Sequence, residues 1–71
     1  MANITKDFGP RLRKRRDLLQ LTQADAARAC GVSVNAYTQW ERGVAFPHMR
    51  NIKSVSEFLG IELDELLEFA R

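Results

Sequence analysis

Cysteine and histidine are nearly absent from this chain, which has one residue of each among 71. A single cysteine cannot form an internal disulfide, and it cannot supply paired metal ligands. The sequence also has no glycine-rich phosphate loop and no cluster with metal-ligand spacing, so it offers nothing for catalysis. We therefore expect neither an enzyme nor a cofactor or metal site. Cys30 itself is expected to be a buried structural thiol.

Long apolar runs are also missing from the sequence. No stretch approaches the ~18 apolar residues of a membrane-spanning helix, and the opening residues, MANITKDF, lack the apolar core of a signal peptide. We expect a cytoplasmic protein with no membrane partner, and no small-molecule ligand is evident. The chain is 45% hydrophobic and 28% charged, which is ordinary for a soluble globular domain.

The chain is short enough for one domain only, which we expect to span residues 1–71. A chain of this size buries only about 60% of its unfolded surface, so a partner subunit would help its stability. Its charge is uneven. Residues 1–20 carry six basic and two acidic side chains, whereas residues 51–71 carry two basic and five acidic ones. The N-terminal part of the chain is therefore suited to binding a polyanion, and the C-terminal part is not.

Two short helical patterns flank a tight break between Thr22 and Gly43, TQADAARACGVSVNAYTQWERG. Thr22 can cap a helix over residues 23–30, and Asp25, three positions after Thr22, can complete a capping box. The alanine-rich segment that follows favours a helix.

The break itself is formed by residues that end one helix and start another. Gly31 suits the left-handed residue that terminates a helix without a Cβ penalty. Ser33 can cap a second helix over residues 34–42, and Gly43 can close that helix. Two helices joined by a glycine-containing turn of about four residues are typical of a helix-turn-helix.

This stretch resembles the helix-turn-helix of the Cro- and lambda-repressor-like family of DNA-binding regulators. The resemblance rests on Gln23 at the start of the first of the two helices, Ala27 inside it and Gly31 in the turn. It also rests on Tyr37 and Trp40, which face inward on the next helix, and on the Glu41-Arg42-Gly43 ending followed by Pro47. The similarity continues through residues 59–66, LGIELDEL, so it covers nearly the whole chain from about Phe8. It implies an all-α, compact five-helix domain.

The resemblance also implies that the third helix lies in the major groove of double-stranded DNA. The side chains expected to face outward, and hence to read bases, are Ser33, Val34, Asn35, Thr38 and Gln39. Asn and Gln amides can bond bidentately to adenine, and Val can contact a thymine methyl group. The alternative is that each is simply a solvated surface residue.

Phosphate contacts are expected on both sides of this helix. On one side they are Thr22 and Gln23, where the start of the second helix offers free N–H groups. On the other side they are Arg42, the backbone of Val44, Ala45 and Phe46, and His48. Arg11 and an arm at Lys6 are weaker candidates.

The first helix is expected over Asp7–Leu19, after a flexible arm at residues 1–6. Phe8, Leu12 and Leu19 recur at helical spacing, and Pro10 should lie in the first turn. Arg15 and Arg16 interrupt this apolar stripe, so at least one of them should face inward and need a carboxylate. The resemblance implies an ion pair between Arg16 and Glu41; the alternative is two exposed charges.

The fourth helix should begin at Pro47 or His48 and end at Gly60. Its apolar face should consist of Met49, Ile52, Val55 and Leu59. A last helix is expected over Leu63–Ala70. Residues 60–71, together with Phe58, hold more apolar surface than one short helix needs. They either close the core or form a dimer contact, for which Phe58, Leu66 and Phe69 are the candidates.

The function that follows is a sequence-specific, double-stranded-DNA-binding transcriptional regulator that acts as a repressor and a homodimer. The alternative is a protein-interaction module, antitoxin-like or adaptor-like, that keeps the fold without specific DNA binding.

Overall fold

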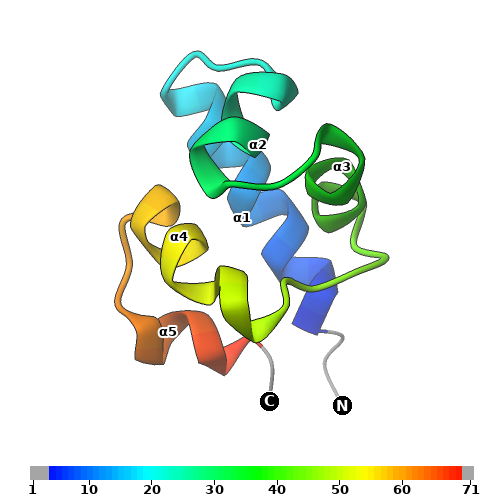
Figure 1. Cartoon of the computed structure of the whole chain (residues 1–71). Helices are drawn as coiled ribbons and strands as arrows, with labels where there is room; N and C mark the ends of the chain where they lie inside the picture. The colour runs from blue at the N-terminus through cyan, green and yellow to red at the C-terminus, as the bar shows by residue number, and fades with distance from the viewer. Residues whose placement is uncertain (1–3, 70–71) are drawn as a thin grey trace.

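The computed structural model describes residues 4–69, with side chains from Asp7 onward. This part of the chain is compact and holds five helices and no strand (Figure 1). The helices are α1 (Ile4–Leu18), α2 (Gln23–Cys30), α3 (Val34–Arg42), α4 (Met49–Leu59) and α5 (Leu63–Glu68). None of them is both long and apolar enough to cross a membrane.

The start and end signals of α2 and α3 work as the sequence predicts. The hydroxyl of Thr22 accepts from the Asp25 N–H, and the Asp25 carboxylate accepts from the Thr22 N–H, which completes the capping box. Ser33 caps α3 through the N–H of Ala36. Gly31 and Gly43 end the two helices with φ values of 75° and 79°, where glycine has no Cβ penalty.

The first helix begins earlier than predicted. It starts at Ile4, so residues 4–6 are helical rather than part of an arm, while residues 1–3 of the predicted arm lie outside the described residues. Pro10 consequently lies inside the helix and not in its first turn. Proline removes one helical hydrogen bond, but Phe8 and Leu12 are fully buried beside it. We attribute the continuation of the helix to this tertiary packing, which outweighs local propensity.

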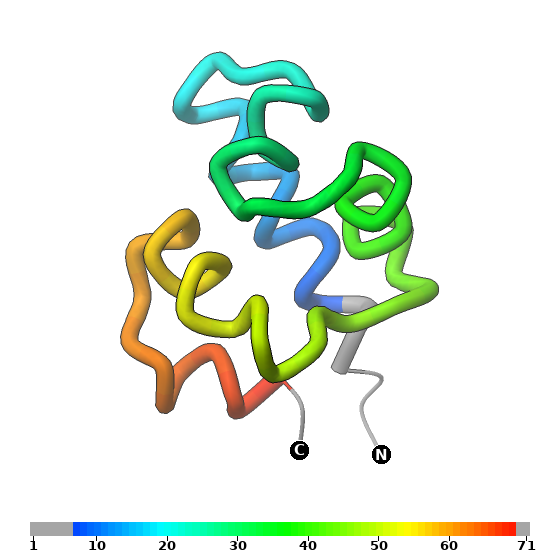
Figure 2. Tube along the Cα trace, in the orientation of Figure 1, coloured from blue at the N-terminus to red at the C-terminus, as the bar shows by residue number. Residues whose placement is uncertain are grey.

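The core is formed where α1, α2, α3 and α4 meet, and α5 covers it from below in the view of Figure 2. Its buried apolar residues are Phe8, Leu12, Ala26, Ala27, Cys30, Tyr37, Trp40, Ile52, Val55, Phe58, Leu59 and Leu66. Tyr37 packs edge-on against both Trp40 and Phe58. The small Ala26 and Ala27 are buried on α2, which packs against α3, so small side chains on one helix share the core with large rings on the next.

Several predicted apolar positions are not in the core. Leu19 is 42% exposed and Met49 is 78% exposed, so each leaves the apolar stripe to which we assigned it. The fourth helix starts at Met49, whereas the sequence predicted a start at Pro47 or His48. His48 is instead the N-cap residue, and its side chain makes no capping hydrogen bond. The last helix ends at Glu68 rather than Ala70, which lies outside the described residues.

Candidate nucleic-acid interface

A buried ion pair, Arg16–Glu41, joins α1 to the end of α3, as the family resemblance implies and as an inward-facing arginine in the interrupted stripe requires. The Arg16 Nε atom lies 2.7 Å from Glu41 Oε2, and a second guanidinium nitrogen lies 3.2 Å from Oε1. The side chains are only 15% and 6% exposed. A third Arg16 N–H group donates to the backbone carbonyl of Leu21, which lies in the connection between α1 and α2. Bidentate geometry of this kind fixes direction as well as distance, so α3 is held in one orientation relative to α1.

Glu41 also connects α3 to the start of α2. Its Oε1 atom accepts a hydrogen bond from the Gln23 side-chain amide at 3.1 Å. The hydroxyl of Tyr37 has no partner of good hydrogen-bond geometry, yet it lies close enough to Glu41 to act on it electrostatically. Burial tends to raise the pKa of the Glu41 carboxyl, but Arg16, Tyr37 and Gln23 together hold that pKa below its usual value. Glu41 is therefore an anion that fixes the two helices of the motif.

This network reduces the number of N–H groups at the start of α2 that are free to bind a phosphate. One N–H of the Gln23 amide is engaged by Glu41, and the Asp25 and Thr22 N–H groups are engaged in the capping box. The first-turn N–H groups of Gln23 and Ala24 have no acceptor within a helix. Arg28 lies 3.2 Å from the Asp25 carboxylate and offsets its charge. The Gln23 amide, held by Glu41, is thus the fixed polar group at this end.

Some side chains on the outer face of α3 make hydrogen bonds within the helix, and others are exposed without such bonds. Ser33 accepts from Ala36, and Thr38 donates its hydroxyl to the carbonyl of Val34 at 2.7 Å. Asn35 is exposed, Gln39 is half-buried and the Val34 side chain is 46% exposed. All five predicted residues lie on or at the start of α3. Ser33 and Thr38 are thus engaged within the α3 segment, whereas Val34 and Asn35 are exposed and Gln39 is half-buried beside them.

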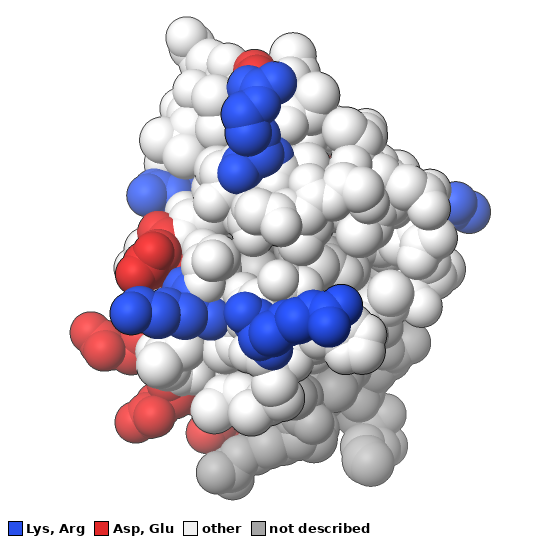
Figure 3. Space-filling model, in the orientation of Figure 1, with Lys and Arg blue, Asp and Glu red and all other residues white. Residues whose placement is uncertain are grey.

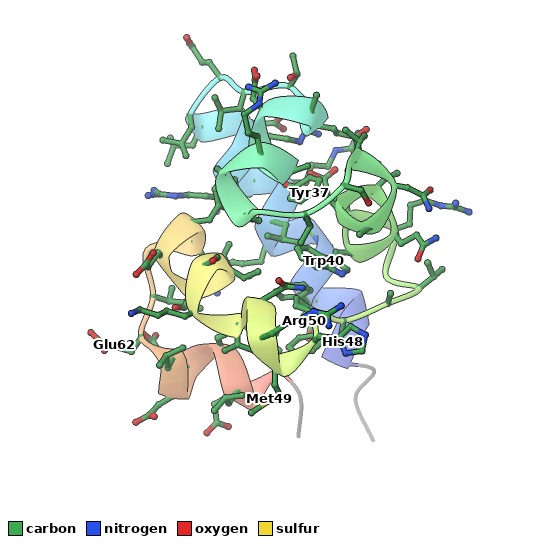
Figure 4. All side chains as sticks on the ribbon, in the orientation of Figure 1. Tyr37, Trp40, His48, Met49, Arg50 and Glu62 are labelled. Atoms are coloured by element: carbon green, nitrogen blue, oxygen red, sulfur yellow. The ribbon has the colours of Figure 1, made fainter. Side chains whose placement is uncertain are left out.

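A depression of about 450 Å³ separates α3 from the start of α4. Trp40 and Phe46 line it together with Gln39, and His48, Arg50 and Asn51 line its α4 side. Figure 4 shows His48 and Arg50 near each other at this end of α4. Arg50 and Asn51 were not among the predicted residues. Their only sequence signal is their place within four residues of Pro47, at the start of the helix.

One predicted group, Arg11, is not brought to this region. Arg11 lies 6.0 Å from the ring of Phe69 and lines a groove between α1 and the end of α4, which it shares with Lys14, Arg15 and Leu18. The structure therefore separates Arg11 from α3, because the rotation of α1 that buries Phe8 and Leu12 turns this arginine toward α5. The Lys6 side chain lies outside the described residues.

The residues predicted for a dimer contact are corrected in part. Phe58 is 8% exposed and Leu66 is fully buried, so both close the core of their own chain. Phe69 is half-buried against Phe8. The apolar side chains that α5 does expose are Leu63 and Leu67.

No group of metal-ligating side chains occurs among residues 7–69. The only cysteine, Cys30, is buried, and burial raises the pKa of its thiol to about 11. It is therefore protonated at neutral pH and packs as a small apolar side chain.

The fold and this geometry define a class: a small all-helical domain in which a helix-turn-helix presents one polar helix outward. Residues 12–66 match the family model described as Helix-turn-helix. The chain belongs to this helix-turn-helix family.

Two curated relatives and one solved structure are similar to it. The chain is 36% identical over 61 residues to the HTH-type transcriptional activator BcrR of Enterococcus faecalis, covering 86% of this chain. It is 38% identical over 64 residues to repressor protein C2 of Salmonella phage P22, covering 90% of this chain. The chain spans only 30% of the length of each of these relatives. The solution structure of the DNA-binding domain of the P22 C2 repressor superposes with a TM-score of 0.72 at 38% identity, covering 84% of this chain and 79% of that domain.

Proposed function

We propose that this chain is the sequence-specific DNA-binding domain of a transcriptional regulator, and that the regulator is a repressor which binds its operator as a homodimer. One observation carries the proposal. The α3 helix presents Val34, Asn35 and Gln39 outward, and hydrogen-bonding groups lie on both sides of it, at Gln23 and at His48 and Arg50. An exposed helix with such groups on both flanks matches a recognition helix in a major groove.

Base reading would come from the exposed start of α3. The Asn35 and Gln39 amides can each donate to and accept from an adenine edge, and the Val34 methyl groups can contact a thymine methyl group. None of the predicted reading positions holds arginine or lysine, which make the commonest contact to guanine. We therefore expect half-sites specified mainly by A·T pairs.

Affinity would come from the phosphate backbone on both sides of the groove. At α2 the donors are the first-turn N–H groups and Gln23, aided by the positive end of the helix dipole. On the other side they are Arg42, the backbone of residues 44–46, the N-cap residue His48 and Arg50 in the first turn of α4. Because Glu41 holds Gln23 at 3.1 Å, the first phosphate position is fixed relative to α3 before DNA binds.

The relatives support this proposal. The P22 protein is named a repressor, and the solved domain is described as DNA-binding, while BcrR is named an activator. We place this regulator in the cytoplasm, together with the DNA on which it would act. A dimer would place two α3 helices about one helical turn, ~34 Å, apart on a pseudo-palindromic site.

The test is selection of bound duplexes from a random library, followed by binding measurements on the selected site over a range of salt. We expect affinity to fall by ~10³-fold or more between low and moderate salt, because several phosphates are neutralised per dimer. Arg42→Ala and Arg50→Ala should weaken binding, whereas Lys14→Ala removes an equal charge from the groove on α1 and should not. No retention of any duplex would favour the interaction-module alternative, and salt-insensitive binding would contradict the phosphate contacts.

A further inference from the structure

The groove between α1 and the end of α4 combines basic and apolar side chains. Its volume is about 420 Å³, and it is lined by Arg11, Lys14, Arg15 and Leu18 of α1 and by Leu59 of α4. The four α1 residues are spaced three or four positions apart or are adjacent, so they share one side of the helix. The volume falls in the range of ligand sites, roughly 300–1,000 Å³. We call this site the α1 groove.

Arg15 is a fixed cation in the wall of the α1 groove. Its Nε atom donates to the backbone carbonyl of Phe58 at 2.8 Å, in the last turn of α4. A Cβ atom at Gly60 would stand 3.3 Å from a terminal nitrogen of this guanidinium, so the glycine leaves room for Arg15 against the end of the helix. Within the described part of the chain, only Nε is hydrogen-bonded. The two terminal nitrogens are therefore held in place for another acceptor.

The other two cations of the groove also lack an acidic partner. Arg11 and Lys14 are exposed, and the Arg11 guanidinium lies 6.0 Å from the ring of Phe69. No carboxylate of residues 7–69 forms an ion pair with Arg11, Lys14 or Arg15. On the face drawn in Figure 3, basic side chains cross the middle and acidic side chains gather at the lower left, so the two signs are segregated over the surface. The α1 groove is therefore suited to an anionic partner.

The apolar side chains of the groove narrow the class of anion. Leu18 is 71% exposed, whereas Leu59 is only 6% exposed at the groove. Phosphates of a nucleic acid would neutralise the cations but would leave Leu18 in water. A flat lipid surface could cover Leu18 but would not reach Leu59. A protein segment can supply carboxylates for the cations and an apolar side chain for the two leucines.

We propose that the α1 groove docks an acidic amphipathic segment of a partner protein, in which carboxylates flank a large apolar side chain. The carboxylates pair with Arg11, Lys14 and the terminal nitrogens of Arg15, whose planar group matches a carboxylate. The apolar side chain covers Leu18 and Leu59, as an anchor does in helix-in-groove recognition. A second copy of this chain joined through the same groove would place cations against cations. Because the groove contains no residue of α2 or α3, the partner can dock while the chain holds DNA.

The first experiment selects ligands for the wild-type chain from a random peptide library displayed on phage. We expect the enriched peptides to carry acidic residues around a leucine or an aromatic residue. The affinity of a labelled selected peptide is then measured by fluorescence anisotropy. Lys14→Glu and Leu18→Ser should each weaken it by about tenfold or more, since they remove a charge pair and an apolar contact.

Two matched variants outside the groove serve as controls. Lys53→Glu makes the same charge change at an exposed position of α4, and Leu67→Ser makes the same apolar change at an exposed position of α5. Both should bind the peptide as the wild type does. The proposal is overturned if no peptide is enriched, if the enriched peptides are not acidic, or if the controls lose as much affinity as Lys14→Glu and Leu18→Ser.

A second experiment tests the charge pairing directly. Each acidic residue of the selected peptide is replaced in turn by lysine, and the series is measured against Lys14→Glu. One of these peptides should regain most of the lost affinity for that variant, because the pair is restored with its signs exchanged. If none of them does, Lys14 does not meet a carboxylate of the peptide. Arg15 is left intact in these tests because it also holds the end of α4.

Further measurements distinguish the other possible occupants of the groove. The labelled peptide should stay bound when a selected duplex saturates the chain, and its displacement would assign the groove to nucleic acid. Vesicles of phosphatidylserine and phosphatidylcholine should show no binding that depends on Lys14 and Leu18, and such binding would assign the groove to a membrane surface. Self-association lost in Lys14→Glu but kept in Lys53→Glu would assign it to a second copy. Each of these results would overturn the proposal.

The outcomes also separate this inference from the proposed function. A chain that binds the acidic peptide through the groove but retains no duplex would contradict DNA binding alone. A chain that retains duplexes but enriches no acidic peptide would contradict the docking surface alone. Circular dichroism of each variant confirms that it is folded before affinities are compared.

Discussion

Gly9 of α1 lies directly against the backbone carbonyl of Glu41 at the end of α3. A Cβ atom added at Gly9 would stand 3.0 Å from the carbonyl oxygen of Trp40 and closer still to that of Glu41. The two helices therefore touch backbone to backbone at this point. The same contact brings Arg16, two turns further along α1, within reach of the Glu41 carboxylate.

Replacing Gly9 by alanine tests this close approach. In an unhindered helix, glycine to alanine stabilises by about 0.5–1 kcal/mol. Here the methyl group would force α1 and α3 apart, and overpacking of this kind costs roughly 1–3 kcal/mol. We expect the free energy of unfolding, measured by urea titration, to fall. A gain in stability would show that the two backbones can separate without cost.

The Arg16–Glu41 pair should contribute to stability only as a pair. Removing either charge leaves the other buried, and we expect Arg16→Ala or Glu41→Ala alone to lower the free energy of unfolding by about 3–5 kcal/mol. The double variant should lose much less than the sum of the two. Coupling near zero in this cycle would mean that the contact adds nothing to stability.

The same carboxylate should make stability depend on pH. Burial works to raise the pKa of Glu41, but its hydrogen bonds outweigh burial and place the folded pKa below the unfolded value of about 4.3. Its contribution is then present above pH ~4.3 and is lost as the pH falls through the folded pKa. Urea titrations from pH 7 to pH 3 should show this loss in the wild type, and Glu41→Gln should flatten it. An unchanged slope in that variant would assign the acid sensitivity to other carboxyls.

Gln20 ends the first helix in a conformation that suits glycine. Its φ is +57°, and it is the one non-glycine residue with positive φ in the described part of the chain. A left-handed backbone costs a side-chain-bearing residue about 1–2 kcal/mol, so Gln20→Gly should raise the midpoint of thermal unfolding. Gln20→Ala keeps the Cβ atom and is the control, which should show no such gain. Equal effects of the two would assign the change to the lost glutamine side chain.

Mutations should distinguish the residues that read bases from the residues that bind phosphates. Gln39→Ala should cost ~1–3 kcal/mol on the selected duplex and relax the preference at one base pair. Arg42→Ala should weaken all duplexes alike. The check is a panel of single-base-pair variants of the selected site, measured with each protein. Information concentrated in G·C pairs beneath α3 would overturn the assignment of Asn35 and Gln39 to adenine.

The sequence alone determined the local features of this protein. Thr22 with Asp25, Ser33, and the glycines at 31, 43 and 60 act through their own backbone and near neighbours, so the helix starts and ends that they predict are present in the structure. The Arg16–Glu41 pair was predictable for another reason. Of two arginines in an apolar stripe, at least one must face inward and needs a carboxylate, and the family resemblance indicated which one.

The tertiary structure decided what depends on how the helices are rotated and packed. Periodicity placed Met49 with Ile52 and Val55, yet a residue in the first turn of α4 lies beyond the core, and Met49 is exposed. Phe58 and Leu66 close the core because α5 folds back along α4, while Leu63 and Leu67 are left on its outer edge. Arg11 faces α5 rather than α3. Local sequence sets where a helix begins and ends, but which side of it meets its neighbours is fixed only when all five compete for one small core.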